Sequence, residues 1–407
     1  MTVVLSVLAG GDSIDDCDVL RAASTASVLG HSVLAPSTIG TFLRSFTWGH
    51  ARQLDKVAGE VLARAWAAGA GPGDGPLTID VGSSIVETYG LQKQGGSRFT
   101  YTHVRGYHPL FATMAATGDV VHARLRGGNS NTARGAASFL AETFARATAA
   151  GATGPLSLRA DAGFYSRHVV EACQRANVLF SITVKLSRSM HALISEIGEE
   201  DWSPVPYFLD DGADVAECSY RAFGKGEQGI ACRLIVRRTR PTPGSQLALL
   251  VDYAYHAFIS DQTVPKVPLD VDHRRHAVVE NAIRDLKYGV GLNHLPSGRF
   301  GANAAWLALN VIAHNMSRFS ARIGGLDLTD ITEAHHGPAA VTGTAEPTRA
   351  ARKSFVATDT FRHHHLAMPG RVTRSGRQTT LHLPRDWPWD DQFNHMLSKL
   401  RSVKLAI

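Results

Sequence analysis

The chain has 407 residues, with 42 Lys and Arg against 36 Asp and Glu, 44% hydrophobic residues and a net charge of +6. This length predicts two or three domains, and the composition excludes a chain that is disordered throughout. The charge permits a nucleic-acid partner without requiring one. The sequence contains no apolar stretch that spans a bilayer, and its apolar start lacks the basic residues of a signal peptide, so we expect a cytoplasmic protein without membrane contact. The four cysteines form no CxxC pair, which argues against a disulfide framework or a Cys-type zinc site.

Residues 1–70 are predicted to be helical, because apolar residues recur at helical spacing in several short segments. The segment that follows Pro36 and Ser37 fits two interpretations: a DNA-recognition helix or a helical packing module. Because the chain opens inside what resembles a buried helix, the sequence also suggests that an N-terminal piece is missing.

A Gly- and Pro-rich linker at 71–76 separates this region from a different pattern. Three predicted strands are followed by helix, strand, helix and strand, an order that predicts a mixed α/β sheet. From about 200 to 262 the pattern contains strands without helices, which indicates a β-rich insertion or subdomain. Helices return at 271–288 and 302–322. Residues 324–407 are predicted to form a loose linker and a basic C-terminal tail with one strand and a final helix.

Three carboxylates stand out by their surroundings. Asp80 lies in an apolar strand, Asp161 directly follows another, and Glu280 lies in a predicted helix. A carboxylate in an apolar strand is costly unless it is paired or bound to metal. Oxygen ligands suit Mg²⁺ or Mn²⁺, and two such ions activate the attacking oxygen and stabilise the leaving oxygen in phosphodiester chemistry. Singly, each residue has a plainer role, as a turn cap, a helix N-cap or a surface residue.

The predicted helix around Glu280 carries further polar residues on one face. His273, His276, Glu280 and Lys287 follow one another at positions i, i+3, i+7 and i+14. This spacing suits a carboxylate at a metal and a cation that reaches a neighbouring phosphate. The alternative is an ordinary amphipathic helix in which Ile283 packs and the lysine is solvated.

These residues resemble the DDE transposases of bacterial insertion sequences, in the superfamily named after insertion sequence four. That superfamily has the signature Y-x2-R-x3-E-x6-K. Aligned on Glu280, Lys287 matches the lysine, whereas His273 and His276 replace the tyrosine and the arginine. The sequence Asp161-Ala-Gly-Phe is also similar to the family pattern D-x-G-F/Y. The resemblance extends over about 75–323, including the position of the β-rich insertion.

The resemblance implies an RNase H-like catalytic core with Asp80, Asp161 and Glu280 as catalytic and metal-binding residues and two Mg²⁺ or Mn²⁺ ions as cofactors. It implies cleavage at terminal inverted repeats and transfer of 3′-OH ends into target DNA. The partners would be double-stranded DNA and a second copy of the chain in a synaptic complex. Arg274 and Arg275 lie where they compensate for the two histidines.

Basic residues cluster in the tail. Residues 349–377 contain one acid, Asp359, and seven cations: Arg349, Arg352, Lys353, Arg362, Arg371, Arg374 and Arg377. This cluster is interpreted either as a phosphate-contacting surface or as a solvated linker. Two other functions stay open from the sequence: a truncated, catalytically silent DNA-binding remnant, and a metal-dependent nuclease that cuts without joining.

Overall fold

The computed structural model describes residues 1–22, 24–90, 93, 96–205, 212–224, 226–240, 253–326 and 357–403. Most of the predicted linker at 324–353, with three of the seven tail cations (Arg349, Arg352 and Lys353), lies outside these residues.

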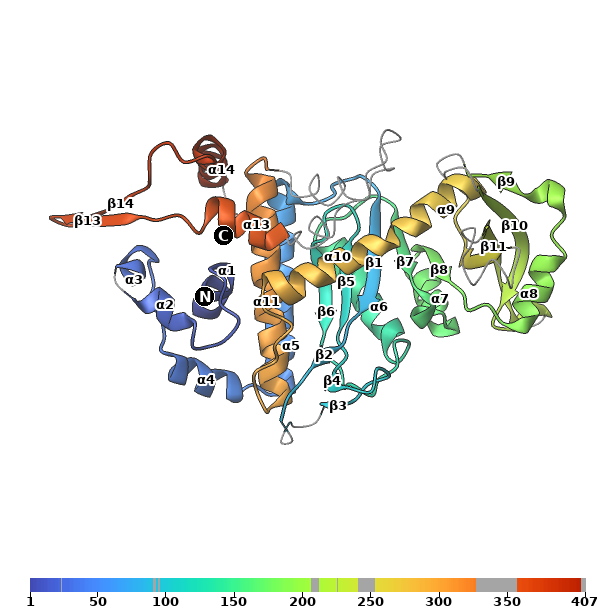
Figure 1. Ribbon diagram of the computed structural model, residues 1–407, viewed down its shortest axis with the longest axis horizontal. Coiled ribbons are helices and arrows are strands. Elements are labelled where there is room, and N and C mark those ends of the chain that lie inside the picture. The colour runs from blue at the N-terminus through green and yellow to red at the C-terminus, as the bar shows by residue number, and fades with distance from the viewer. Residues whose placement is uncertain are drawn as a thin grey trace.

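The N-terminal region is helical, as predicted. Its elements are α1 (Thr2–Leu8), α2 (Cys17–Arg21), α3 (Thr25–Val28), α4 (Pro36–Arg44), α5 (Trp48–Ala65) and a π-helical turn at Trp66–Ala70. Pro36 occupies the first turn of α4, where the missing N–H is not needed. Val3, Val7, Ile39 and Leu43 are buried in a core shared with the long helix α11 (Phe300–Ile323). This region therefore packs on the rest of the chain (Figure 1).

A nine-stranded mixed sheet forms the centre of the molecule, in the order β6-β5-β1-β7-β8-β12-β11-β10-β9. Its first half consists of β1 (Leu77–Ser83), β5 (Leu110–Met114), β6 (Val120–Arg124), β7 (Leu156–Ala160) and β8 (Leu179–Thr183). The strand β1 pairs antiparallel with β5 and parallel with β7. This is the mixed α/β sheet that the alternation of elements predicted.

The β-rich segment continues this sheet. It contains β9 (Ser203–Pro204), β10 (Ala213–Ala222), β11 (Ile230–Thr239) and β12 (Ala254–Ser260). Strand β12 pairs antiparallel with β8, with Phe258 opposite Thr183. The ladder is thus unbroken from the core strands into the insertion. A three-stranded sheet of β2 (Val86–Glu87), β4 (Arg105–Tyr107) and β3 (Arg98–Phe99) lies beyond the end of β1.

Helices cover the sheet on its two faces. They include α6 (Ala136–Ala149), α7 (Arg167–Arg175), α8 (Arg188–Ser195), α9 (Lys266–Arg274) and α10 (Val278–Arg284). Helices α9 and α10 follow one another across the middle of the sheet, joined by a 3-10 turn at Arg275–Ala277 and extended by a π-helical turn at Asp285–Gly289 (Figure 1). The predicted single helix at 271–288 is therefore a chain of helical segments.

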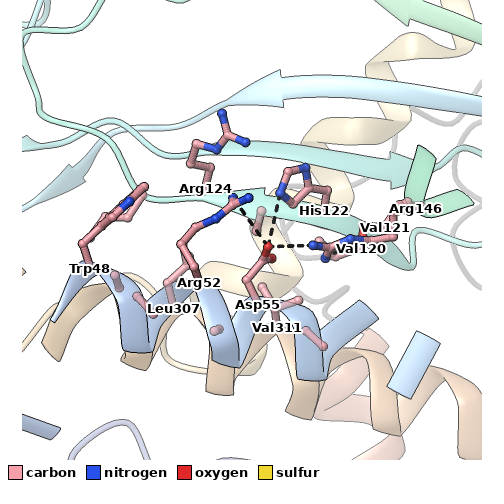
Figure 2. A pocket seen from close by; sticks show the side chains of 16 residues that line it. Trp48, Arg52, Asp55, Val120, Val121, His122, Arg124, Arg146, Leu307 and Val311 are labelled. Carbon is pink, nitrogen blue, oxygen red and sulfur yellow. Dashed lines mark hydrogen bonds and ion pairs between the residues drawn. The ribbon is translucent and has the colours of Figure 1, made fainter. Parts of the chain in front are cut away.

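A charged cluster joins α5 to the sheet beside a hollow of ≈ 40 Å³ (Figure 2). The Asp55 carboxylate accepts a hydrogen bond from Arg146 at 2.7 Å and lies 3.7 Å from Nε2 of His122. Burial lowers the pKa of His122 well below its ordinary value, and the nearby guanidinium of Arg146 adds to this effect. The cluster therefore fixes the N-terminal helices electrostatically as well as through apolar contacts.

The C-terminal tail forms α13 (Ala357–His365), a hairpin of β13 (Arg371–Ser375) and β14 (Gln378–His382), and α14 (Asp390–Ser402). The tail thus contains two paired strands, whereas the sequence predicted one strand there. Trp389 stacks on His364 at a ring distance of 3.9 Å, so this tryptophan packs against α13. Within the described residues, no helix is both long and apolar enough to cross a membrane.

Candidate active site

Asp80 lies in the middle of β1 with 0% of its surface exposed. Arg159, its neighbour on β7, donates from Nε to Oδ1 and from Nη2 to Oδ2, both at 2.8 Å. Nδ1 of His276 lies 3.1 Å from Oδ1. Burial on its own lowers the pKa of Arg159, but the bonds to Asp80 outweigh it and raise that pKa. Both oxygens of the Asp80 carboxylate are therefore engaged by a permanent cation.

Asp161 lies just beyond the end of β7 and is exposed to solvent. Its Oδ1 accepts a 2.7 Å hydrogen bond from the backbone N–H of Gly163, so the side chain caps a short 3-10 turn. The sequence interpretation of Asp161 as an N-cap is thus confirmed, and it does not exclude a catalytic role. Only one carboxylate oxygen, Oδ1, takes part in the cap.

Helices α9 and α10 bring several predicted site residues over the ends of β1 and β7. Glu280 is exposed in the first turn of α10, four residues after His276. His273 is buried instead, stacked on Phe258 with ring centroids 4.0 Å apart. Its Nδ1 bonds to Ser181 and its Nε2 lies 2.9 Å from Oγ1 of Thr183. Because His273 has no free ring nitrogen at the surface, it leaves the set of residues expected to contact DNA.

Lys287 is half-buried in the π-helical turn that follows α10. Its Nζ donates to the backbone carbonyl of Ile85 at 2.9 Å, just after β1 ends. Burial lowers the pKa of this ammonium group. The lysine is thus tied to the backbone at the end of β1, and a phosphate contact would compete with the carbonyl of Ile85.

A hollow of ≈ 580 Å³ is lined in part by Ala162 and Gly163, which directly follow Asp161. Its wall includes Gly163, Thr132 and Lys185, and the side chains of Phe99 and Tyr101 stand at it with 71% and 73% of their surface exposed. Exposed aromatic rings beside a cation are the features on which nucleic-acid bases stack and to which the backbone is attracted. Neither aromatic residue was predicted from the sequence. The run of aromatic and polar residues at 98–103 is the sequence feature that points to such a surface.

His108 links the hollow to β1. Its Nε2 lies 2.9 Å from Oγ of Ser83 and its Nδ1 lies 2.8 Å from the carbonyl of Ser130. Burial lowers the pKa of His108, and the negative charge of Asp161 partly opposes this effect. His108 therefore ties Ser83 at the end of β1 to Ser130 in the wall of the hollow.

The remaining predicted basic residues lie at two places. Arg274 and Arg275 are exposed where α9 ends, on the segment that leads to Glu280 in α10. Arg371, Arg374 and Arg377 are exposed on the tail hairpin, which projects from the opposite side of the molecule (Figure 1). A single compact contact does not include both groups, so the hairpin is a separate basic surface.

Residues 1–325 match the family model described as transposase DDE domain, group 1. The match covers the helical N-terminal region, the whole sheet and helix α11. The chain belongs to this transposase family. This confirms the resemblance that the carboxylate and lysine spacing indicated.

Among solved structures, this family member is similar to a piggyBac transposase in a synaptic complex with hairpin DNA, with 12% sequence identity and a TM-score of 0.42. The similarity covers 79% of this chain and 65% of that chain, so the chain spans about two thirds of the length of its structural neighbour. No curated protein matches the chain.

Enzymes of the DDE family generally use divalent metal ions. Within the described residues, no group of three or more His, Cys, Asp or Glu side chains is arranged to hold a metal ion. The reason lies at Asp80, whose two oxygens bind the guanidinium of Arg159. A cation placed there would be repelled by Arg159 at close range. Among the described residues, the three predicted carboxylates therefore do not form one donor set.

Proposed function

We propose that this chain is a DNA transposase that recognises the terminal inverted repeats of a mobile element, as a homodimer, and acts on phosphodiester bonds there. The acts proposed are cleavage at the element ends and transfer of 3′-OH ends into target DNA, with Mg²⁺ or Mn²⁺ as cofactor. Family membership supports the class of reaction, because DDE transposases are nucleases and transesterases as a class.

The observation that carries the proposal is the hollow beside Asp161. Its lining combines Lys185 with two exposed aromatic rings, and it includes Ala162 and Gly163, which directly follow the exposed Asp161. A DNA strand in this hollow would stack a base on Phe99 or Tyr101, and its backbone would lie near Lys185. The scissile phosphate would then lie beside Asp161 and below Glu280. Specificity for the repeats is assigned to base contacts elsewhere, with Arg274 and Arg275 at the backbone.

The test uses end-labelled DNA from the flanks of the gene, with Mg²⁺, with Mn²⁺ and with EDTA. We expect the chain to prefer flank DNA over shuffled DNA of equal length, and metal-dependent cuts at one defined position. Tyr101→Ala should weaken binding of flank DNA by about tenfold, because stacking is worth about 1–3 kcal/mol per base. Tyr89→Ala is the matched control, since Tyr89 is also a highly exposed tyrosine but does not line the hollow. Equal binding of flank and shuffled DNA would contradict the proposal.

A further inference from the structure

The position on β1 that faces Asp161 is not Asp80. Asp80 lies opposite Arg159 and Val81 lies opposite Ala160 in the parallel ladder of β1 and β7. The ladder ends at this pair, and Gly82 and Asp161 are the next residues of the two segments, so the register continued by one step would set position 82 beside Asp161. Because side chains alternate along a strand, positions 80 and 82 share one face.

That shared face is the one that α10 covers. A Cβ atom built on Gly82 would lie 3.0 Å from Cδ1 of Ile283 and 3.3 Å from Cγ2 of Val279. Glu280 follows Val279 directly in α10. A side chain at position 82 would thus point toward α10, the helix that carries Glu280.

We propose that Asp80 is a structural residue that holds Arg159, and that position 82 is the place on β1 for a carboxylate that binds a metal ion together with Asp161 and Glu280. In this chain Gly82 leaves that place without a ligand. The inference rests on the proposed function and deepens it. The chain, as it stands, binds a divalent ion through two carboxylates and cuts DNA slowly, while its binding of DNA does not depend on position 82.

Glycine is not required at position 82 by the backbone. Gly82 is not among the residues with a left-handed conformation, and it pairs with Phe111 in the regular ladder of β1 and β5. The nearest obstacle to a side chain is the terminal methyl group of Ile283, which is the end of a flexible side chain. A Cβ atom at position 82 therefore requires Ile283 to shift by a few tenths of an ångström, and Ile283→Val removes the obstructing methyl group.

The experiment measures Mn²⁺ binding by the full chain without DNA, from the loss of the electron paramagnetic resonance signal of free Mn²⁺. The variants are Gly82→Asp and the uncharged, equally sized Gly82→Asn, each in the natural chain and with Ile283→Val. We expect Gly82→Asp to bind Mn²⁺ about tenfold more tightly than the natural chain, since charge count sets the affinity of oxygen-ligand sites. Gly82→Asn should not tighten binding. Adding Asp161→Asn to Gly82→Asp should remove the gain.

Three results would overturn the inference. The first is that Gly82→Asp binds Mn²⁺ no better than Gly82→Asn. The second is that Gly82→Asp fails to fold even with Ile283→Val, which would mean that position 82 has no room for a ligand. The third is that Asp80→Asn, shown by circular dichroism to be folded, loses the Mn²⁺ affinity of the natural chain, which would make Asp80 the ligand.

Failure of this inference is distinguishable from failure of the proposed function. Mn²⁺ binding is measured without DNA, whereas the function is tested by preference for flank DNA over shuffled DNA. If the chain prefers flank DNA but Gly82→Asp gains no Mn²⁺ affinity, the proposed function is supported and the inference about position 82 is contradicted. If Gly82→Asp gains Mn²⁺ affinity but the chain binds flank and shuffled DNA equally, the proposed metal site is supported and the proposed function is contradicted.

Discussion

Two groups of carboxylates in this molecule have opposite surroundings. Asp80 and Asp285 are buried and saturated: Asp80 by Arg159, and Asp285 by His314, Arg318 and the backbone N–H and hydroxyl of Thr358. Asp161 and Glu280 are exposed, and neither has a cationic partner among the described ion pairs. Burial opposes the charge of Asp285, yet its bonds hold its pKa well below the ordinary value.

The comparison shows why a carboxylate in an apolar strand is an ambiguous signal. Burial makes an unpaired charge too costly, so a counter-charge is required, but a metal ion and an arginine meet that requirement equally well. The arginine at Asp80 comes from a strand 79 residues later in the chain. The exposed carboxylates, which the burial argument favoured least, are the ones left with oxygens available to a ligand.

Removing the cation from the buried pair should have the largest effect on stability. Arg159→Met leaves the Asp80 charge buried without its partner, so we expect the free energy of unfolding to fall by about 3–5 kcal/mol. The measurement is urea unfolding followed by circular dichroism. The double variant Asp80→Leu/Arg159→Met should recover most of the loss, because it removes both charges. An unchanged midpoint for Arg159→Met would mean that the pair does not support the fold.

Mild acid should destabilise the protein next most strongly. Burial lowers the pKa values of His122 and His273 well below 6.5 and that of His365 to about 4. Below pH 6.5 the unfolded chain binds protons that the folded chain does not, so stability should fall as pH decreases from about 6.5 to 4 and stay flat above 7. Each unit by which folding lowers the pKa of a histidine reduces the free energy of unfolding in acid by up to about 1.4 kcal/mol.

Urea unfolding at pH 7.5, 6.0 and 5.0 measures this dependence. His365→Gln should flatten the curve in part, since one of the three groups no longer titrates. Stability that rises between pH 6.5 and 5 would contradict the assignment of these histidines as neutral in the folded chain.

Substitution of the exposed carboxylates should have almost no effect on the free energy of unfolding. Asp161→Asn retains an oxygen that accepts from Gly163, and Glu280→Gln lies on the surface, so each should change the free energy of unfolding by less than about 0.5 kcal/mol. Both should nevertheless abolish the weak cleavage of flank DNA. A loss of stability comparable to that of Arg159→Met would place these residues in the buried group instead.

Substitutions in the tail hairpin should have the smallest effect of all on the stability of the fold. Arg371→Ala and Arg374→Ala remove exposed cations, so the unfolding midpoint should not move. If the hairpin contacts phosphates, each change should lower the slope of log affinity for DNA against log salt by about one. A slope that is unchanged in the double variant would favour the interpretation of this segment as a solvated surface.

Much of the fold was predictable because it depends on local patterns. The strands around Asp80 and Asp161, the helical N-terminal region and the absence of helices from the 200–262 segment all follow from the periodicity of apolar residues. The joining of that segment to the central sheet was not predictable, because the pairing of β12 with β8 joins segments about 75 residues apart. The division of 271–288 into short helical segments was also missed.

For the candidate site, the sequence by itself determined which residue types are present and in what order: two aspartates after or within apolar strands, a glutamate on a late helix, and a lysine seven residues beyond it. Those are properties of spacing, which the chain carries without folding. Only the tertiary structure decided which charges meet. It placed Arg159 on Asp80, buried His273 against Phe258, brought Phe99 and Tyr101 to the hollow lined by Gly163, and paired Val81 with Ala160, the residues just before Gly82 and Asp161. The reason is physical: the state of a carboxylate depends on neighbours that are distant in sequence, and register between strands selects those neighbours.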